Sequence, residues 1–209
     1  HESFVPAAPV PPIPKDKKSW GRYRDRIRSE LDHKVFSAWP KKKTKAEENS
    51  ALGFSSDGIR FSVHRFVSQE PWELSLYLVH RDGLDREDLD LVVLNVLNAE
   101  GWNDFASTYG KSFAQGFPKD LKLPAHDVKA FDLESRMLKN QKWAMAYIAP
   151  RGIGPTAWSG DRRKRNQILR RFYLLGETLD GMRVHDIVCS ADALRTVPGM
   201  EKISIWMQS

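Results

Sequence analysis

The chain has 209 residues, with 33 Lys and Arg against 27 Asp and Glu, and 41% of its residues are hydrophobic. A chain of this length buries a substantial core, and its composition excludes collagen-like, coiled-coil and largely disordered proteins. The sequence has no apolar run of the roughly 18 residues that a membrane-spanning helix needs. Its one cysteine excludes an internal disulfide framework and any cysteine-rich zinc site.

The positive charge is concentrated near the beginning of the chain. Residues 15–45 contain twelve Lys and Arg and four acidic residues, so this segment carries +8 and the rest of the chain −2. A basic segment of this kind can neutralise nucleic-acid phosphates. It also has apolar residues at helical spacing, which are Trp20, Tyr23, Ile27, Leu31 and Val35. This stripe favours an amphipathic helix packed on a domain with its arginines in water, so we expect no nucleic-acid partner.

The sequence divides into three regions. Residues 1–14 contain five prolines and are predicted to form an extended linker. Residues 15–48 are predicted to form the basic amphipathic helix, capped by Ser19 and ended by Pro40, followed by a solvated loop. Residues 49–209 are then the main domain.

The main domain contains five segments with the pattern of strands. Alternating apolar residues predict strands at 59–64 and 74–79, each with one face buried, as an antiparallel pair near a sheet edge. More continuous apolar runs at 89–97 and 143–149 predict strands covered on both faces. Residues 203–207 are the last predicted strand.

Helices are predicted between these strands. Asp127 precedes a helix that runs to about Gln141, and further helices are expected at 102–109, 162–175 and 178–197. Strands followed by alternating strands and helices predict an α/β fold, with a mostly parallel sheet, an antiparallel start and flanking helices.

Several patterns in the sequence are similar to binding motifs. Gly152 and Gly154 follow a strand and precede a helix, but Pro155 removes a backbone donor from this loop, so dinucleotide binding is not expected. The six histidines do not pair at metal-ligand spacing, and no metal site is predicted. His185 and Asp186, in the middle of a helix, indicate a surface or packing pair.

Two further groups of residues are interpreted as surface features. His64 alternates with the buried face of its strand and is expected to be exposed. The basic run 162–165, with Arg170 and Arg171, is typical of a solvated helix face, with anion binding as the alternative.

The last quarter of the chain resembles a known family. Residues 143–158 read WAMAYIAPRGIGPTAW and residues 170–197 read RRFYLLGETLDGMRVHDIVCSADALRTV. They resemble the acetyl-xylan-esterase-like α/β-hydrolases of bacteria, in which a strand ends in an Arg-Gly loop and a helix follows with the pattern Leu-Gly-x-Thr-Leu-x-Gly-x-Arg-Val-x-Asp. The matching residues are Leu175, Gly176, Thr178, Leu179, Gly181, Arg183, Val184 and Asp186. The beginning of the chain resembles the bridge between two hydrolase modules in long members of this group.

The resemblance implies where catalytic residues lie. In the family, the next strand delivers the nucleophilic serine on a sharp G-x-S-x-G turn. Ser209 falls near that place, two residues after Met207, which stands where the family has glycine. Ser209 is therefore a candidate nucleophile, or else a turn residue before the true nucleophile. Oxyanion or binding roles are implied for Asn98, Ala99 and Arg151, although the segment beginning at Asn98 lacks the His-Gly pair of many esterases.

We expect the chain to be the N-terminal part of a serine hydrolase from a larger, multi-domain protein. The implied substrate is a small-molecule or polysaccharide ester, in particular a carbohydrate acetyl ester, cleaved through an acyl-serine intermediate without metal or cofactor. The downstream acid and histidine of the triad are not in this sequence, so the fragment is expected to be inactive alone.

Two alternatives remain open. The first is a non-catalytic, degenerate hydrolase fold that serves packing or substrate binding beside an active module, and we expect the domain to pack against another module in either case. A basic nucleic-acid-binding protein is the second alternative. The family resemblance also implies an exported or periplasmic precursor, although the sequence shows no signal peptide.

Overall fold

The chain consists of two compact units, His1–Ala38 and Trp39–Ser209. The computed structural model describes residues 10–40, 52–158 and 160–209. The predicted linker at 1–14 therefore falls mostly outside the described residues, and the predicted loop after Pro40 falls entirely outside them.

The first unit contains helix α1, which spans Lys17–Lys34. The prediction that Ser19 caps this helix is wrong, because Asp16 accepts a hydrogen bond from the Ser19 N–H at 2.7 Å. Ser19 Oγ in turn accepts one from the Asp16 N–H at 3.1 Å, so the two residues form a capping box. The helix ends well before Pro40, and none of its residues is buried. Its packing on a domain stays a prediction.

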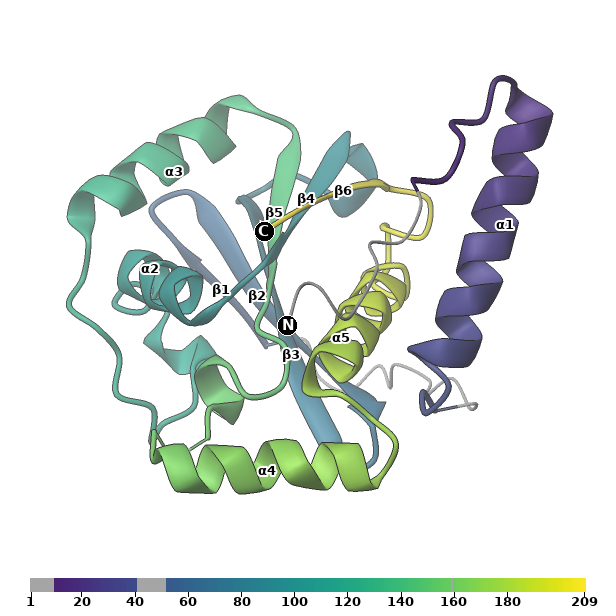
Figure 1. Ribbon diagram of the computed structural model, residues 1–209. Helices are drawn as coiled ribbons and strands as arrows, with labels where there is room; N and C mark the ends of the chain where they lie inside the picture. Colours follow the sequence, from purple (N-terminus) through teal and green to yellow (C-terminus); the bar gives the residue numbers. More distant parts are fainter. Residues whose placement is uncertain (1–9, 41–51, 159) are drawn as a thin grey trace. The chain divides into compact units, whose positions relative to one another are not determined.

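The second unit is built on a sheet of six described strands in the order β1-β2-β3-β5-β4-β6 (Figure 1). Strands β1, β2, β3 and β5 pair antiparallel in that order, whereas β4 pairs parallel with both β5 and β6. The predicted antiparallel start and parallel continuation are confirmed, in a mixed sheet in which three of the five described pairings are antiparallel and two are parallel. The strands are β1 Leu52–Ser56, β2 Ile59–Gln69, β3 Trp72–Arg81, β4 Leu91–Val96, β5 Trp143–Ile148 and β6 Ser204–Gln208.

Helices cover both faces of the sheet, as Figure 1 shows for α2 and α3 on one side and α5 on the other. The α-helices of the second unit are α2 Ala99–Tyr109, α3 Val128–Asn140, α4 Arg162–Leu174 and α5 Leu179–Leu194. Short 3-10 helices lie at η1 Arg86–Asp88, η2 Ala114–Gly116 and η3 Gly154–Thr156. No residue of α4 is buried, which agrees with the interpretation of its basic run as a solvated face.

The core under α2 and α3 is rich in aromatic rings. Phe61 of β2 is fully buried at its centre, and its ring lies 4.8 Å from that of Phe113. Other rings within contact distance of Phe61 belong to Tyr77, Phe105, Tyr109 and Phe117. This packing fixes α2 on the sheet, and with it the loop that leads from β4 into α2.

Strand β3 buries both of its faces, whereas the sequence predicted one. Tyr77 and Val79 lie in the aromatic core, and Leu76 and Leu78 lie in the core under α5. The reason is the position of the strand, since β3 lies between β2 and β5 rather than at an edge. A strand in that position is covered by helices on both sides.

A carboxyl group joins two tyrosines inside this aromatic core. The hydroxyls of Tyr109 in α2 and Tyr147 in β5 both donate to Glu134 Oε2 of α3, at 3.0 Å from Tyr147. Burial, together with the neighbouring Glu134 and the other phenol, raises the pKa of Tyr109 well above its ordinary value. Burial and Glu134 do the same to the pKa of Tyr147. The cluster therefore requires both phenols to be protonated.

Candidate active site

The sequence-predicted site residues lie at one edge of the sheet. Strands β4, β5 and β6 run parallel, so their carboxyl ends meet at the same edge. Asn98 follows β4, Arg151 follows β5 and Ser209 follows β6. In sheets of this kind, ligands bind in the crevice outside the carboxyl ends of the strands.

A pocket of about 360 Å³ opens at this edge between the ends of β4 and β6. It brings Asn98 and Ser209 together, while Ala99 begins the helix whose first turn forms one wall. Arg151 does not line it. The lining residues are Asn95, Val96, Leu97, Asn98, Glu100, Gly101, Asp104, Gln208 and Ser209.

The first turn of α2 supplies backbone donors beside this pocket. Asn98 caps the helix, because its side-chain oxygen accepts a hydrogen bond from the Gly101 N–H at 2.8 Å. The next N–H groups, of Ala99 and Glu100, belong to the first turn, where backbone donors have no acceptor within their own helix. Such a helix start also carries partial positive charge, so it favours a developing negative charge nearby.

Two amide side chains, those of Asn95 and Gln208, line the pocket, and the sequence analysis missed both. Gln208 Nε2 donates to Asn95 Oδ1 at 2.6 Å, which ties the end of β6 to β4. Asn95 Nδ2 donates to the Ala146 carbonyl of β5 at 3.1 Å, so one side chain joins three strands. The signal available in the sequence was a single polar residue inside the apolar run 91–97.

Arg151 is part of a buried network rather than of the pocket wall. It is 1% exposed, and its guanidinium donates to Asp186 Oδ1 and Oδ2 at 2.7 and 2.9 Å. The Arg151 N–H donates to the same carboxyl group at 2.9 Å. Gln69 and Ser68 of β2 accept its remaining contacts at 3.0 and 3.2 Å. These bonds lock the loop after β5 onto α5 and β2.

The histidines differ from one another in their surroundings. His185 and Asp186 are both buried, so of the two predicted alternatives the packing pair is the correct one. The prediction that His64 is exposed is wrong, since it is half-buried with Nε2 at 3.1 Å from Ser62 Oγ. Burial, with a smaller contribution from Arg86, lowers the pKa of His64 to about 4. Within the described residues, no histidine lines the pocket that contains Ser209.

No group of three or more His, Cys, Asp or Glu is arranged to hold a metal ion in the ranges that the structure covers. No helix in those ranges has the length and apolar character needed to cross a membrane.

Two solved structures share this architecture. A candidate acetyl xylan esterase from Bacteroides fragilis matches with a TM-score of 0.60 and 12% identity, over 91% of this chain and 47% of the other. The glucuronoyl esterase of Solibacter usitatus matches with a TM-score of 0.51 and 11% identity, over 99% of this chain and 58% of the other. The chain has an esterase-like α/β-hydrolase fold.

This chain spans 47% and 58% of the lengths of the two esterases. No protein-family model matches the sequence, and no curated protein matches it. At these identities the comparison establishes the fold, and the predicted fold class is thereby confirmed. The roles of Ser209, Asn98, Ala99 and Arg151 stay predictions.

Proposed function

We propose that the chain belongs to a serine hydrolase of carboxylic esters, in particular carbohydrate acetyl esters, with Ser209 as the nucleophile. The observation that supports this best is the pocket that combines Ser209 with the first turn of α2 at the carboxyl edge of a hydrolase-type sheet. Both structural neighbours are named as esterases that act on carbohydrates or their acids.

The proposed chemistry assigns one step to each part of the pocket. Ser209 Oγ attacks the ester carbonyl and forms an acyl-serine, the alcohol leaves, and water then hydrolyses the acyl-serine. The N–H groups of Ala99 and Glu100 stabilise the negative charge on the carbonyl oxygen. Asn98 positions these donors by capping the helix, and Arg151 positions the loop after β5. The histidine and its acid are proposed to come from residues outside this sequence.

The experiment that tests this proposal is the Ser209→Ala substitution in the longer protein of which we propose this chain is a part. Hydrolysis of p-nitrophenyl acetate and of acetylated xylan is expected to fall by at least about 10³-fold, since the acyl-serine can no longer form. Ser204→Ala is a matched control, because Ser204 is an exposed serine at the start of the same strand. Unchanged turnover in Ser209→Ala would show that Ser209 is not the nucleophile.

The 209-residue chain itself is expected to show no saturable turnover of p-nitrophenyl acetate. The physical reason is that no histidine of the described residues lines the pocket, so Ser209 Oγ has no histidine there to take its proton. Release of p-nitrophenol should match that of the Ser209→Ala chain and should not respond to a serine-directed phosphonate. Turnover that such a reagent abolishes would contradict this expectation.

A second proposal is a non-catalytic hydrolase fold that packs beside, or presents substrate to, an active module. It is favoured by Met207, which stands where the family pattern has glycine and is half exposed beside Ser209. The same Ser209→Ala experiment separates the two, because a non-catalytic module predicts equal activity in both proteins.

A further inference from the structure

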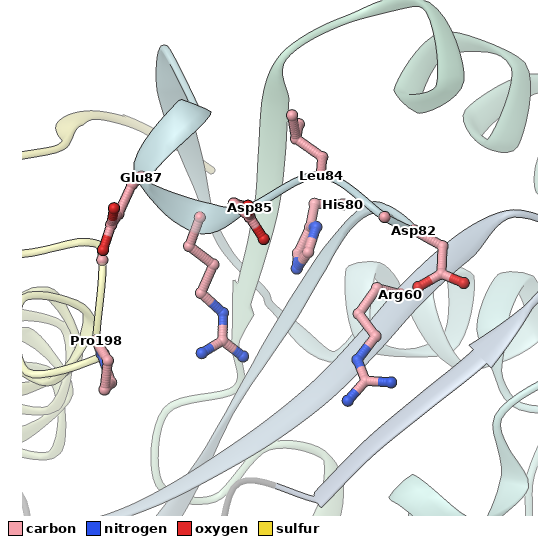
Figure 2. Close-up of a pocket in the computed structure, with 10 residues that line it drawn as sticks. Arg60, His80, Asp82, Leu84, Asp85, Glu87 and Pro198 are labelled. Atoms are coloured by element: carbon pink, nitrogen blue, oxygen red, sulfur yellow. The ribbon is translucent and has the colours of Figure 1, made fainter.

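A second pocket lies at the opposite edge of the sheet and has a volume of about 500 Å³. Its walls come from the start of β2, the end of β3, the segment 82–87 and the turn at Pro198 and Gly199. Figure 2 shows Pro198 on one side of the pocket and Arg60 and His80 toward the other. His80 pairs with Ala144 near the beginning of β5, so this pocket is remote from the one at the carboxyl ends of the strands.

His80 places a buried hydrogen-bond acceptor in this wall. The residue is 4% exposed, and its Nδ1 lies 2.9 Å from the Arg81 carbonyl. Because a carbonyl oxygen only accepts, Nδ1 must carry the hydrogen, which leaves a lone pair on Nε2. Burial lowers the pKa of His80, so the ring is neutral near pH 7. Nε2 has no partner among the described residues.

An unpartnered buried nitrogen requires an explanation. Buried polar atoms in folded proteins are satisfied by protein groups, by water or by a ligand, because leaving one unpaired is unfavourable. The lone pair on Nε2 specifically needs a donor, and a hydroxyl group is one. Neither Arg60 nor Arg86 is this donor, since neither donates a hydrogen bond to His80 Nε2 in the described structure.

Two arginines line this pocket together with His80. Arg60 stands directly opposite His80 in the register of β2 and β3, so both side chains project from the same face of the sheet. The Arg60 guanidinium reaches toward β1, where its Nη1 donates to Ser55 Oγ at 3.2 Å, and its other N–H groups remain as donors. Arg86 is half-buried and lines the same pocket. Burial and the charge of Arg60 lower the pKa of Arg86, and both arginines line the pocket.

The charges in the lining select the class of ligand. Against the two arginines stand three exposed carboxyl groups, those of Asp82, Asp85 and Glu87. The carboxyl groups repel a multiply charged anion, and the arginines repel a cation. A molecule without net charge that offers both donors and acceptors avoids both repulsions and can hydrogen-bond to this lining. Hydroxyl groups do both, whereas a single charged group does only one.

We propose that this pocket binds an uncharged, polyhydroxylated molecule of mono- or disaccharide size. One hydroxyl donates to His80 Nε2, and neighbouring hydroxyl oxygens accept from Arg60 and Arg86. The volume of about 500 Å³ lies within the range of small-molecule sites. This inference does not depend on the proposed esterase function, because it uses none of the residues of the Ser209 pocket.

The test is a titration of the 209-residue chain, labelled with ¹⁵N, followed through the imidazole nitrogen signals of His80. Xylobiose is expected to shift the Nε2 signal saturably, as a hydroxyl begins to donate to it. Arg86→Gln and Arg60→Gln are each expected to weaken xylobiose binding by about tenfold. Arg136→Gln, which removes an exposed arginine of α3 outside this pocket, should bind as the unchanged chain does.

Three results would overturn the proposal. The first is no response of His80 to xylobiose, which would leave only water as the partner of Nε2. The second is a response to inorganic phosphate in place of xylobiose, which would indicate an anion site. The third is unchanged xylobiose affinity in both arginine variants. Backbone amide spectra of each variant establish that it is folded, and having two variants keeps the test valid if one of them is not.

Discussion

Replacing Arg151 with Met is expected to lower the free energy of unfolding by about 3–5 kcal/mol, because the buried carboxyl group of Asp186 then loses its charged partner. Both side chains are almost completely inaccessible, at 1% and 0% exposure, so water cannot replace the lost contacts. Urea unfolding followed by tryptophan fluorescence measures this loss.

Two further variants test the cause of the Arg151 effect. Arg65→Met breaks an exposed pair with Glu73, whose atoms are 3.9 Å apart, and is expected to change stability by less than about 1 kcal/mol. Adding Asp186→Leu to Arg151→Met should restore much of the loss, because no unpaired charge remains buried. A single Arg151→Met variant as stable as the original chain would show that the pair is not important for the fold.

Stability is also expected to fall steeply above about pH 10. Tyr109 and Tyr147 have pKa values raised in the folded chain, mainly by burial. Below pH 10 both the folded and the unfolded chain keep these phenol protons. Above it the unfolded chain loses them while the folded chain retains them, so rising pH favours unfolding. Each of these two tyrosines then lowers the free energy of unfolding by about 1.4 kcal/mol per pH unit. Burial that raises the pKa of Tyr77 to about 12 adds to the same trend.

The alkaline effect can be separated from other titrating groups with matched substitutions. Tyr147→Phe removes one buried phenol and should make the dependence of unfolding free energy on pH shallower by about 1.4 kcal/mol per unit between pH 10 and 12. Tyr173→Phe removes a phenol that is 65% exposed and should leave the dependence unchanged. Equal slopes in the original chain and in Tyr147→Phe would refute the assignment. Denaturant titrations at half-unit pH intervals provide the slopes.

The local patterns of the sequence predicted most of the helices and strands, because each such element is determined largely by residues that are close together in the sequence. The helix predicted at 162–175 is α4 at Arg162–Leu174, and the strand predicted at 143–149 is β5 at Trp143–Ile148. The helix predicted at 178–197 begins as expected after Thr178 but ends at Leu194. The spacing of apolar residues and the capping residues predict where a helix begins and ends to within a few residues.

Features that depend on strand order could not be predicted in this way. Arg151 and its partner Gln69 are 82 residues apart, and they meet only because β2 lies two positions from β5 in the sheet. The double burial of β3 has the same origin. At the candidate site, parallel strand ends account for the nearness of Asn98 and Ser209, but the Asn95–Gln208 contact requires the register of β4 against β6.

The strand order also has a consequence for how the chain folds. Strands β2 and β3 are joined by two residues and can pair early. Asn95, in contrast, bonds to residues 51 and 113 positions away, in β5 and β6. Loop closure over the longer of these distances costs only about 0.6 kcal/mol more than over the shorter, but a search over such separations slows folding. The hairpin should therefore protect its amides from hydrogen exchange first, and the edge that presents Ser209 should form last.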